Sequence, residues 1–222
     1  MFEGRDLIIA TKHKKEKVLA PILEQGLGVN CFLPEYFDTD TLGTFTGEFE
    51  RELDPISTVR QKCLMAMELS NCDLGVASEG SFGPHPTLFF ASSDDEFLIF
   101  IDKTNNLEII VRELSLETNF NCSEVKNEQE LLEFAKMIKF PSHALILRKT
   151  KTEKIEIIKG LTNEKELKIT FSRMLEKYGS VYAETDMRAM YNPSRMNVIQ
   201  NAAKKLIYKV KSLCPQCNAP GF

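Results

Sequence analysis

The chain has 222 residues, of which 43% are hydrophobic and 27% charged, a composition that excludes disordered, collagen-like and coiled-coil proteins. Its 28 basic and 32 acidic residues leave a net charge of -4. Because that charge provides no long-range attraction to nucleic acid or to an anionic membrane, we expect a small-molecule partner instead of either.

The first eighty residues show apolar runs that alternate with helical periodicity. The strands are expected at 6–10, 29–33 and 73–79. The helix after the first strand contains Pro21, which predicts a kink or a restart. Residues 34–53 lack periodicity, and an irregular segment of that length is often functional. Asp54 and Pro55 then begin a second helix, with an acid at the N-cap and proline at the first helical position.

The second half opens with two apolar runs, 97–103 and 107–114, about Asn105-Asn106, which predict a hairpin. Asn127 and Glu130 form a capping-box pattern before a helix that ends near residue 140. Further strands are expected at 143–149, 154–158 and 181–184, and further helices from Thr162 to Tyr178 and from Pro193, capped by Asn192.

These alternating elements predict an α/β fold with a mixed central sheet flanked by helices. We expect a single two-lobed domain over 1–212, followed by a small tail over 213–222. No apolar run approaches the ~18 residues that span a bilayer, and the start lacks the pattern of a secretory signal. We therefore expect a cytoplasmic protein.

The six cysteines are of two kinds. Four stand singly and are expected to be small buried hydrophobes of a reducing compartment: Cys31, Cys63, Cys72 and Cys122. The other two, Cys214 and Cys217, have the CxxC spacing that turns two thiolates toward one Zn²⁺, but a structural zinc site normally has four ligands. The tail is therefore a shortened zinc ribbon, a site completed by another chain, or free of metal.

A basic segment follows the first predicted strand and enters a helix. It contains Thr11, Lys12, His13 and Lys17. Backbone N–H groups at a helix N-terminus, with ammonium groups beside them, suit a phosphate. The alternative is a solvated, lysine-rich helical turn.

Glu79 follows an apolar strand and is flanked by Ser78 and Ser81. A carboxylate among small residues that let a ligand approach the backbone is a natural Mg²⁺ ligand or base. The glycines of this segment could equally serve a tight turn.

A third cluster follows the last predicted strand. Glu184 and Asp186 leave the strand together, and Arg188 and Arg195 flank the capped start of the final helix, where Ser194 also lies. Acids and arginines at such ends can hold an anionic substrate or its metal complex. Internal salt bridging is the alternative.

The sequence lacks G-x-x-x-x-G-K-[ST], G-x-G-x-x-G, G-x-S-x-G and H-E-x-x-H, so P-loop, dinucleotide, serine-hydrolase and common zinc-protease chemistry lose support. The first eighty-odd residues nevertheless resemble the inosine triphosphate pyrophosphatase superfamily, especially its inosine/xanthosine triphosphatase branch. The segments that carry this resemblance are Ala10 to His13 with Lys17, Thr58 to Lys62, and Val76 to Gly80.

The resemblance implies a two-lobed fold of that superfamily, a homodimer, phosphate contacts from Thr11 and Lys17, and Mg²⁺ held by Glu79. Ser194-Arg195 is similar to its nucleotide-binding S-H-R motif. The whole chain, ending in CPQC-x2-PGF, also resembles a bacterial family of no known activity, which implies a bacterial source and a C-terminal zinc ribbon.

We therefore expect an Mg²⁺-dependent nucleoside triphosphate pyrophosphatase-like hydrolase. Its reaction would depend mainly on the correct positioning of metal and substrate and on the stabilisation of charge. The expected catalytic groups are Glu79, Lys17 and Asp186, with Glu48 as a further Mg²⁺ ligand. The expected substrate contacts are Thr11, Lys12, His13, Arg60, Ser78, Ser81, Arg188, Ser194 and Arg195.

Two alternatives stay open. His13 stands where the superfamily has asparagine, which favours a catalytically silent nucleotide- or anion-binding protein that engages a partner through its CxxC tail. A zinc-linked structural protein is the third interpretation.

Overall fold

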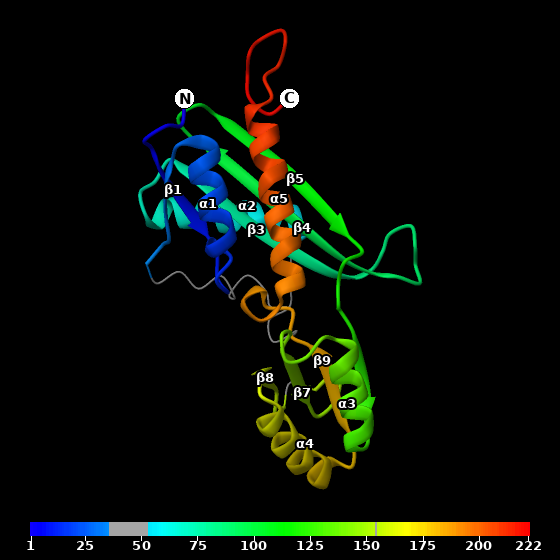
Figure 1. Ribbon diagram of the computed structural model, residues 1–222. Coiled ribbons are helices and arrows are strands. Elements are labelled where there is room, and N and C mark those ends of the chain that lie inside the picture. The colour runs from blue at the N-terminus through cyan, green and yellow to red at the C-terminus, as the bar shows by residue number, and fades with distance from the viewer. Residues whose placement is uncertain (36–52, 154) are drawn as a thin grey trace. The chain divides into compact units, whose positions relative to one another are not determined.

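The computed structural model describes residues 1–35, 53–153 and 155–222, so Glu48 and most of the irregular segment lie outside the described residues. The chain divides into two compact units (Figure 1). The first unit comprises residues 1–81, 94–115 and 196–222, and the second comprises residues 82–93 and 116–195.

The first unit is built on a five-stranded sheet. In chain order its strands are β1 (Asp6–Ala10), β2 (Asn30–Phe32), β3 (Leu74–Pro84), β4 (Ser92–Asp102) and β5 (Leu107–Ser115). They lie in the order β2-β1-β3-β4-β5. Both β2 and β3 run parallel to β1, whereas β5 is antiparallel to β4. The predicted α/β fold with a mixed sheet and flanking helices is confirmed.

Two helices connect the parallel strands: α1 (Glu16–Leu27) leads from β1 to β2, and α2 (Pro55–Leu69) leads from β2 to β3. The two crossovers run in opposite directions along the sheet, so right-handed connections place the helices on opposite faces. One core cluster agrees with this arrangement, because it joins Val59, Cys63, Ala66 and Met67 of α2 to alternate residues of β1 and β4.

The last helix, α5 (Pro193–Lys211), belongs largely to the first unit. A Cβ added to Gly26 of α1 would lie 2.7 Å from Cδ1 of Ile207, so α1 and α5 pack closely. Lys205 and Lys209 donate hydrogen bonds to the carbonyl oxygens of Arg112 and Ile110 on β5. Helix α5 is therefore attached to both α1 and the edge strand.

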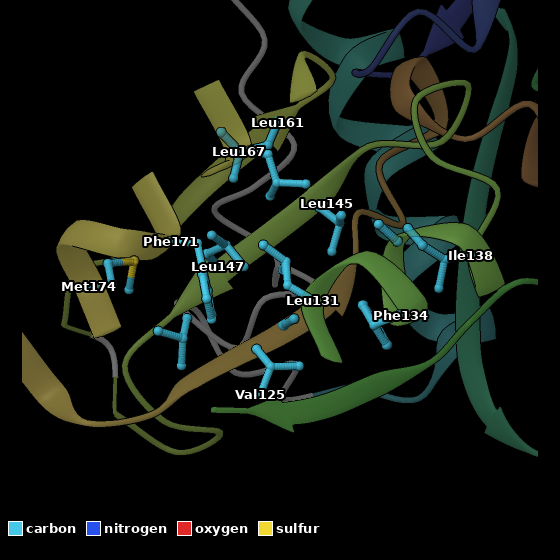
Figure 2. Packing of buried hydrophobic residues seen from close by; sticks show 13 residues of the cluster. Val125, Leu131, Phe134, Ile138, Leu145, Leu147, Leu161, Leu167, Phe171 and Met174 are labelled. Carbon is cyan, nitrogen blue, oxygen red and sulfur yellow. The ribbon is translucent and has the colours of Figure 1, made fainter. Parts of the chain in front are cut away.

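The second unit has its own sheet, formed by β6 (Cys122–Val125), β9 (Val181–Thr185), β7 (Leu145–Arg148) and β8 (Ile158–Leu161) in that order, with antiparallel pairing throughout. Helices α3 (Glu128–Met137) and α4 (Glu164–Tyr178) share one core with this sheet (Figure 2). The labelled members are Val125, Leu131, Phe134, Ile138, Leu145, Leu147, Leu161, Leu167, Phe171 and Met174. Since they form a single cluster, both helices cover the same face.

Local signals located most elements correctly. Asp54 accepts hydrogen bonds from the backbone of Ile56 and Ser57, and Asn127 caps α3 as predicted. Helix α4 is capped by Asn163 instead of Thr162, because the amide oxygen of Asn163 accepts the N–H of Glu166.

Helix α1 runs through Pro21 without a restart, and Leu19, Leu23 and Leu27 on both sides of it are buried along one stripe. Of the two outcomes expected at Pro21, the restart is therefore wrong and the kink stays a prediction. Strand β8 begins at Ile158, the last residue of the predicted segment 154–158, and β6 was not predicted. Both are four-residue strands, which are too short to show a period of two clearly.

Strand β3 continues to Pro84, and β4 begins at Ser92, five residues before the apolar run that predicted it. The extra residues are mainly polar, so their strand character comes from pairing within the sheet. In the described part of the chain, no helix has both the length and the apolar character needed to cross a membrane.

Candidate functional site at the end of the parallel strands

The connections of the first sheet diverge at the carboxyl end of β1, beside the point in β3 where its pairing with β1 ends. Strand β1 is hydrogen-bonded to β2 on one side and to β3 on the other. The connection after β1 leads to β2, whereas the connection after β3 leads in the opposite direction along the sheet, to β4. Ligands of α/β sheets bind outside the carboxyl ends of strands at such a reversal. Ala10 at the end of β1 pairs with Ala77, so Thr11 and Ser78 both follow the paired residues directly.

The turn from β1 to α1 has an unusual backbone. His13 and Lys14 both have positive φ, 67° and 60°, and Lys15 returns to the right-handed helical region. Each left-handed residue that is not glycine costs roughly 1–2 kcal/mol. Such strain persists where the surrounding structure imposes it, and a turn of this kind directs successive N–H groups toward one point.

The side chain of Lys15 points toward the sheet and away from solvent. Its side chain is buried, and Nζ donates a hydrogen bond to Oγ of Ser78 at 3.0 Å and lies 4.0 Å from Oε2 of Glu96. Glu96 and Asp94 are also buried, and they lie two residues apart on β4, so their side chains share one face. Three elements thus bring an ammonium group, a hydroxyl and two carboxyl groups to one side of the sheet.

Lys62 of α2 and Glu79 form a second buried ion pair. Glu79 follows Ser78 directly in β3, so the two side chains point to opposite faces of the sheet. Lys62 comes from the helix on the α2 face, next to Cys63 in the core cluster. The two pairs therefore lie on either side of the same strand, close to its paired end.

We call Lys15, Lys62, Ser78, Glu79, Asp94 and Glu96 the switch-point cluster. Its charged groups are two amines and three carboxyl groups, all buried. Burying ionisable groups is costly even when they are paired, and such groups concentrate at functional sites. The excess of carboxyl groups suits a bound cation.

Mg²⁺ is a cation that the carboxyl groups of the cluster could hold together with a substrate. Across the described ranges no three His, Cys, Asp or Glu side chains converge on one point. Mg²⁺ is commonly held by one or two carboxylates, water and substrate phosphate oxygens. Asp94 and Glu96, from one face of one strand, match this smaller set, and the hard oxygen donors match the ion.

The structure brings together some of the residues that the sequence singled out in the first unit. Ser78 and Glu79 belong to the cluster, and Ser81 lies half-buried farther along β3. Thr11, Lys12 and His13 are half-buried in the turn, where Oγ1 of Thr11 donates to the carbonyl oxygen of Lys12 at 3.0 Å.

Two predicted phosphate-binding residues lie elsewhere. Lys17 is exposed on α1. Arg60 is half-exposed and is paired with Glu108, whose carboxylate raises the pKa of the guanidinium. The buried lysines of the same two segments are Lys15 and Lys62.

The sequence contained a signal for one of the residues that were missed. Lys62 lies three residues after Val59 and four before Ala66, which places it on the apolar stripe of its helix. Asp94 and Glu96 lie in an all-polar stretch at the start of a strand whose apolar part alone was recognised, so the sequence pattern did not single them out.

In the second unit Asp186 is hydrogen-bonded to neighbouring residues of the same unit. Its buried carboxylate accepts hydrogen bonds from Nη2 of Arg188 at 2.6 Å and from the backbone N–H of Gly160 at 3.0 Å. The Arg188 guanidinium also lies over the ring of Tyr191, 4.6 Å from its centre. Asp186 and Arg188 therefore form the internal salt bridge that was the alternative interpretation of this segment.

Arg195 is almost fully buried in the second unit. Its Nη1 donates to the carbonyl oxygen of Met187 at 2.5 Å, and its guanidinium lies 4.9 Å from the centre of the Phe82 ring. Its backbone N–H donates to Oδ1 of Asn192, which caps α5 as predicted. The guanidinium therefore has structural contacts in its own unit.

Ser194 contacts a buried histidine, His143, of the same unit. The Ser194 backbone N–H donates to Nε2 of His143 at 3.2 Å, and its Oγ lies 2.9 Å from the same nitrogen. Burial lowers the pKa of His143, and the nearby charge of Lys139 lowers it further. A neutral imidazole thus completes the N-terminus of α5.

The predicted cleft combines Thr11, Lys17 and Glu79 of the first unit with Asp186 and Arg195 of the second. Together with Glu48, which lies outside the described residues, their convergence stays a prediction. The switch-point cluster lies in the first unit alone.

The single cysteines differ from one another in burial. Cys63 is buried as expected, Cys31 and Cys72 are half-buried, and Cys122 is exposed, so the expectation was wrong for Cys122. Burial raises the pKa of the Cys31 thiol to about 12.

Residues 62–222 match the model of a protein family described as a domain of unknown function, DUF6671. The chain belongs to this family. No curated protein matches the chain. The matched range contains Lys62, Glu79, Asp94 and Glu96, as well as the CxxC tail, whereas β1 and Lys15 precede it.

Proposed function

We propose that the protein is an Mg²⁺-dependent hydrolase that cleaves a phosphoanhydride bond of a nucleoside triphosphate or a related phosphorylated metabolite. The observation that carries this proposal is the burial of five ionisable side chains beside the carboxyl end of β1, where its pairing with β3 ends. A two-lobed architecture of the inosine triphosphate pyrophosphatase type, a dimer and a cytoplasmic location belong to the same proposal.

In this proposal the phosphate groups approach the turn after β1. Lys15 presents its ammonium group from the start of α1, where backbone N–H groups and the helix dipole also favour an anion. Lys12 and His13 flank this turn. The ammonium group stabilises negative charge that increases on the phosphate oxygens during cleavage.

Asp94 and Glu96 would hold Mg²⁺, whereas Glu79 points to the opposite face of β3, where it pairs with Lys62, and would not reach the same ion. The ion neutralises phosphate charge and orients the attacking water when it is bound. No protein nucleophile is needed, since the chemistry consists mainly of positioning and charge stabilisation.

The test is an assay of pyrophosphate and phosphate release from a panel of nucleoside triphosphates in Mg²⁺, with and without a chelator. We expect Mg²⁺-dependent turnover of at least one substrate and a loss of roughly 10²-fold or more in Glu96→Gln. The control is Glu108→Gln, because Glu108 is half-exposed on β5 and lies outside the cluster. Absence of turnover across the whole panel would remove the proposal.

The pairing of Glu79 with Lys62 favours a second candidate function, a binding protein without catalysis. The negative charge of the carboxylate is already balanced by the ammonium group of Lys62, so the carboxylate is not needed for a metal or a water molecule. The two functions are distinguished by a thermal shift. A nucleotide at 100 times its Kd stabilises the folded state by about 2.7 kcal/mol. Stabilisation without consumption of the nucleotide supports binding alone.

A further inference from the structure

Two serines and a histidine of the second unit are joined by hydrogen bonds between their side chains. Ser142 and His143 lie between α3 and β7, and Ser194 lies in the first turn of α5, 51 residues from His143. Oγ of Ser142 lies 3.0 Å from Nδ1 of the imidazole, and Oγ of Ser194 lies 2.9 Å from Nε2. Each ring nitrogen therefore faces one hydroxyl group. We call Ser142, His143 and Ser194 the serine–histidine triad.

The backbone around the triad decides which nitrogen of His143 carries the proton. The backbone N–H of Ser194 lies 3.2 Å from Nε2, and since an N–H can only donate, Nε2 is the acceptor nitrogen. The proton of the neutral ring is then on Nδ1. Oγ of Ser142 donates to the carbonyl oxygen of Lys139 at 2.6 Å, so this oxygen accepts from Nδ1. The hydroxyl proton of Ser194 thus points at a nitrogen lone pair.

The members of the triad differ in burial. His143 exposes only 4% of its surface, whereas Ser194 is half-buried and its neighbours Pro193 and Ser142 are exposed. Burial lowers the pKa of His143, and the charge of Lys139 lowers it further, so the ring is uncharged at neutral pH and can accept a proton. The nitrogen base is therefore shielded from solvent, while the hydroxyl group can be reached from it.

The N-terminus of α5 favours negative charge on the oxygen of Ser194. The helix has 19 residues, and the dipole of a helix stabilises an anion in its first turn. A hydroxyl group that faces a histidine, with a third group orienting the ring, is the arrangement of an activated nucleophile. Because the third group here is the neutral hydroxyl of Ser142, a positively charged imidazole would gain no ion pair, and the nucleophile suits substrates with a good leaving group.

Another serine of the chain has the same setting without the histidine. Ser57 is half-buried in the first turn of α2, after Pro55, but its Oγ donates to the carboxylate of Asp54. The hydrogen bonds from Ser57 lower the pKa of Asp54, which makes this carboxylate a weak base. Ser57 is therefore the matched control for the effect of His143 on a serine at a helix N-terminus.

We propose that Ser194 is a nucleophile, activated by His143, that cleaves small carboxylic esters of acidic alcohols. Nε2 takes the hydroxyl proton while Oγ forms a bond to the acyl carbon, and the alcohol leaves with the proton that Nε2 returns. Water then attacks the acyl group, and Nε2 takes a proton from this water. The bond to Oγ breaks, the proton returns to Oγ, and the carboxylic acid is released.

Burial and position define the limits of this activity. The half-burial of Ser194 restricts the acyl group to a small one. Ser142 is a positioning residue, since it acts only by holding the ring of His143. The triad shares no residue with the switch-point cluster, so this activity does not depend on the proposed cleavage of phosphoanhydrides.

The experiment treats the full chain with a fluorophosphonate probe and locates the adduct by peptide mass spectrometry. Oγ displaces fluoride from phosphorus while His143 takes the proton, so the adduct marks the activated serine. Turnover of nitrophenyl acetate is followed by release of the phenolate. We expect an adduct at Ser194 and none at Ser57. In His143→Gln, labelling and turnover should both fall by roughly 10²-fold or more.

Ser194→Ala should abolish both signals without unfolding the chain, because alanine keeps the backbone N–H that donates to His143. Thermal unfolding checks that the fold is retained. Ser57→Ala should leave labelling and turnover unchanged. Ser142→Ala should slow both, and Ser142→Thr, which keeps the hydroxyl group, should restore them. The proposal is overturned if Ser194 stays unlabelled, if Ser57 is labelled equally, or if folded Ser194→Ala turns over the ester at the rate of the natural chain.

Discussion

Lys62 and Arg60 lie two residues apart on α2 and make ion pairs of very different burial. The Lys62–Glu79 pair is buried, whereas Arg60 and Glu108 expose 39% and 38% of their side chains. Removing one partner of a buried pair leaves an uncompensated charge, while exposed pairs are weakened by solvent.

We therefore expect Lys62→Met to lower the free energy of unfolding by roughly 3–5 kcal/mol, and Arg60→Met by about 1 kcal/mol or less. Urea unfolding measures both. The double variant Lys62→Met/Glu79→Met should recover most of the loss, because it removes the buried charge as well. Equal effects of the two single variants would show that burial does not decide the strength of these pairs.

His143 makes stability depend on pH in a predictable direction. Its pKa in the folded protein lies below the usual value, so the unfolded chain takes up a proton first as the pH falls. The contribution of neutral His143 is therefore fully present above a pH of about 6.5 and is lost as the pH falls below that value.

The measurement is the free energy of unfolding between pH 7.5 and 5 in the natural chain and in His143→Gln. We expect the natural chain to lose more stability over this range than the variant, whose side chain does not titrate. The comparison of slopes removes the shared contribution of the carboxyl groups. Parallel curves would contradict the prediction.

At the scale of elements, the distance between α2 and the sheet depends on Gly75. A Cβ at this position would lie 2.7 and 2.8 Å from Cγ and Sδ of Met67 and 3.0 Å from Sγ of Cys63. All three atoms belong to α2 and are buried, so they have little room to move. Glycine at this position lets the helix approach the strand.

Gly75→Ala should therefore destabilise the protein by roughly 1–3 kcal/mol through overpacking. Gly83, on the same strand, provides the control, because a Cβ there would have nothing within 4 Å. Gly83→Ala should leave thermal and urea unfolding nearly unchanged. A loss of similar size in both variants would indicate a general cost of alanine in β3, unrelated to α2.

At the scale of the whole molecule, the two units have separate hydrophobic cores. The cluster around Phe171 contains residues of the second unit only, and the cluster around Val59 contains residues of the first. Separate cores allow sub-global opening of one unit while the other stays folded.

Phe171→Ala removes a buried ring and should cost roughly 3–5 kcal/mol in the second unit. Hydrogen exchange followed by mass spectrometry should then show faster exchange in 82–93 and 116–195, with protection retained in β1, β3 and α2. A uniform increase along the chain would show that the two units unfold as one.

Sequence alone determined the features that local interactions control. Asp54, Asn127 and Asn192 were recognised as helix caps because a cap depends on residues within one turn. The hairpin of β4 and β5 was recognised because its two apolar runs are adjacent in the chain. The CxxC spacing of Cys214 and Cys217 was recognised for the same reason, because it involves only four consecutive residues.

Tertiary structure decided which charged side chains belong to the candidate site. Lys15 and Ser78 are 63 residues apart, and their contact exists only because β1 and β3 pair in one register. From the sequence, Lys15 and Lys17 are equivalent members of a lysine-rich turn. Burial distinguishes them, because the free energy of a charge depends on the solvent and partners around it, and these are set by segments far away in the chain.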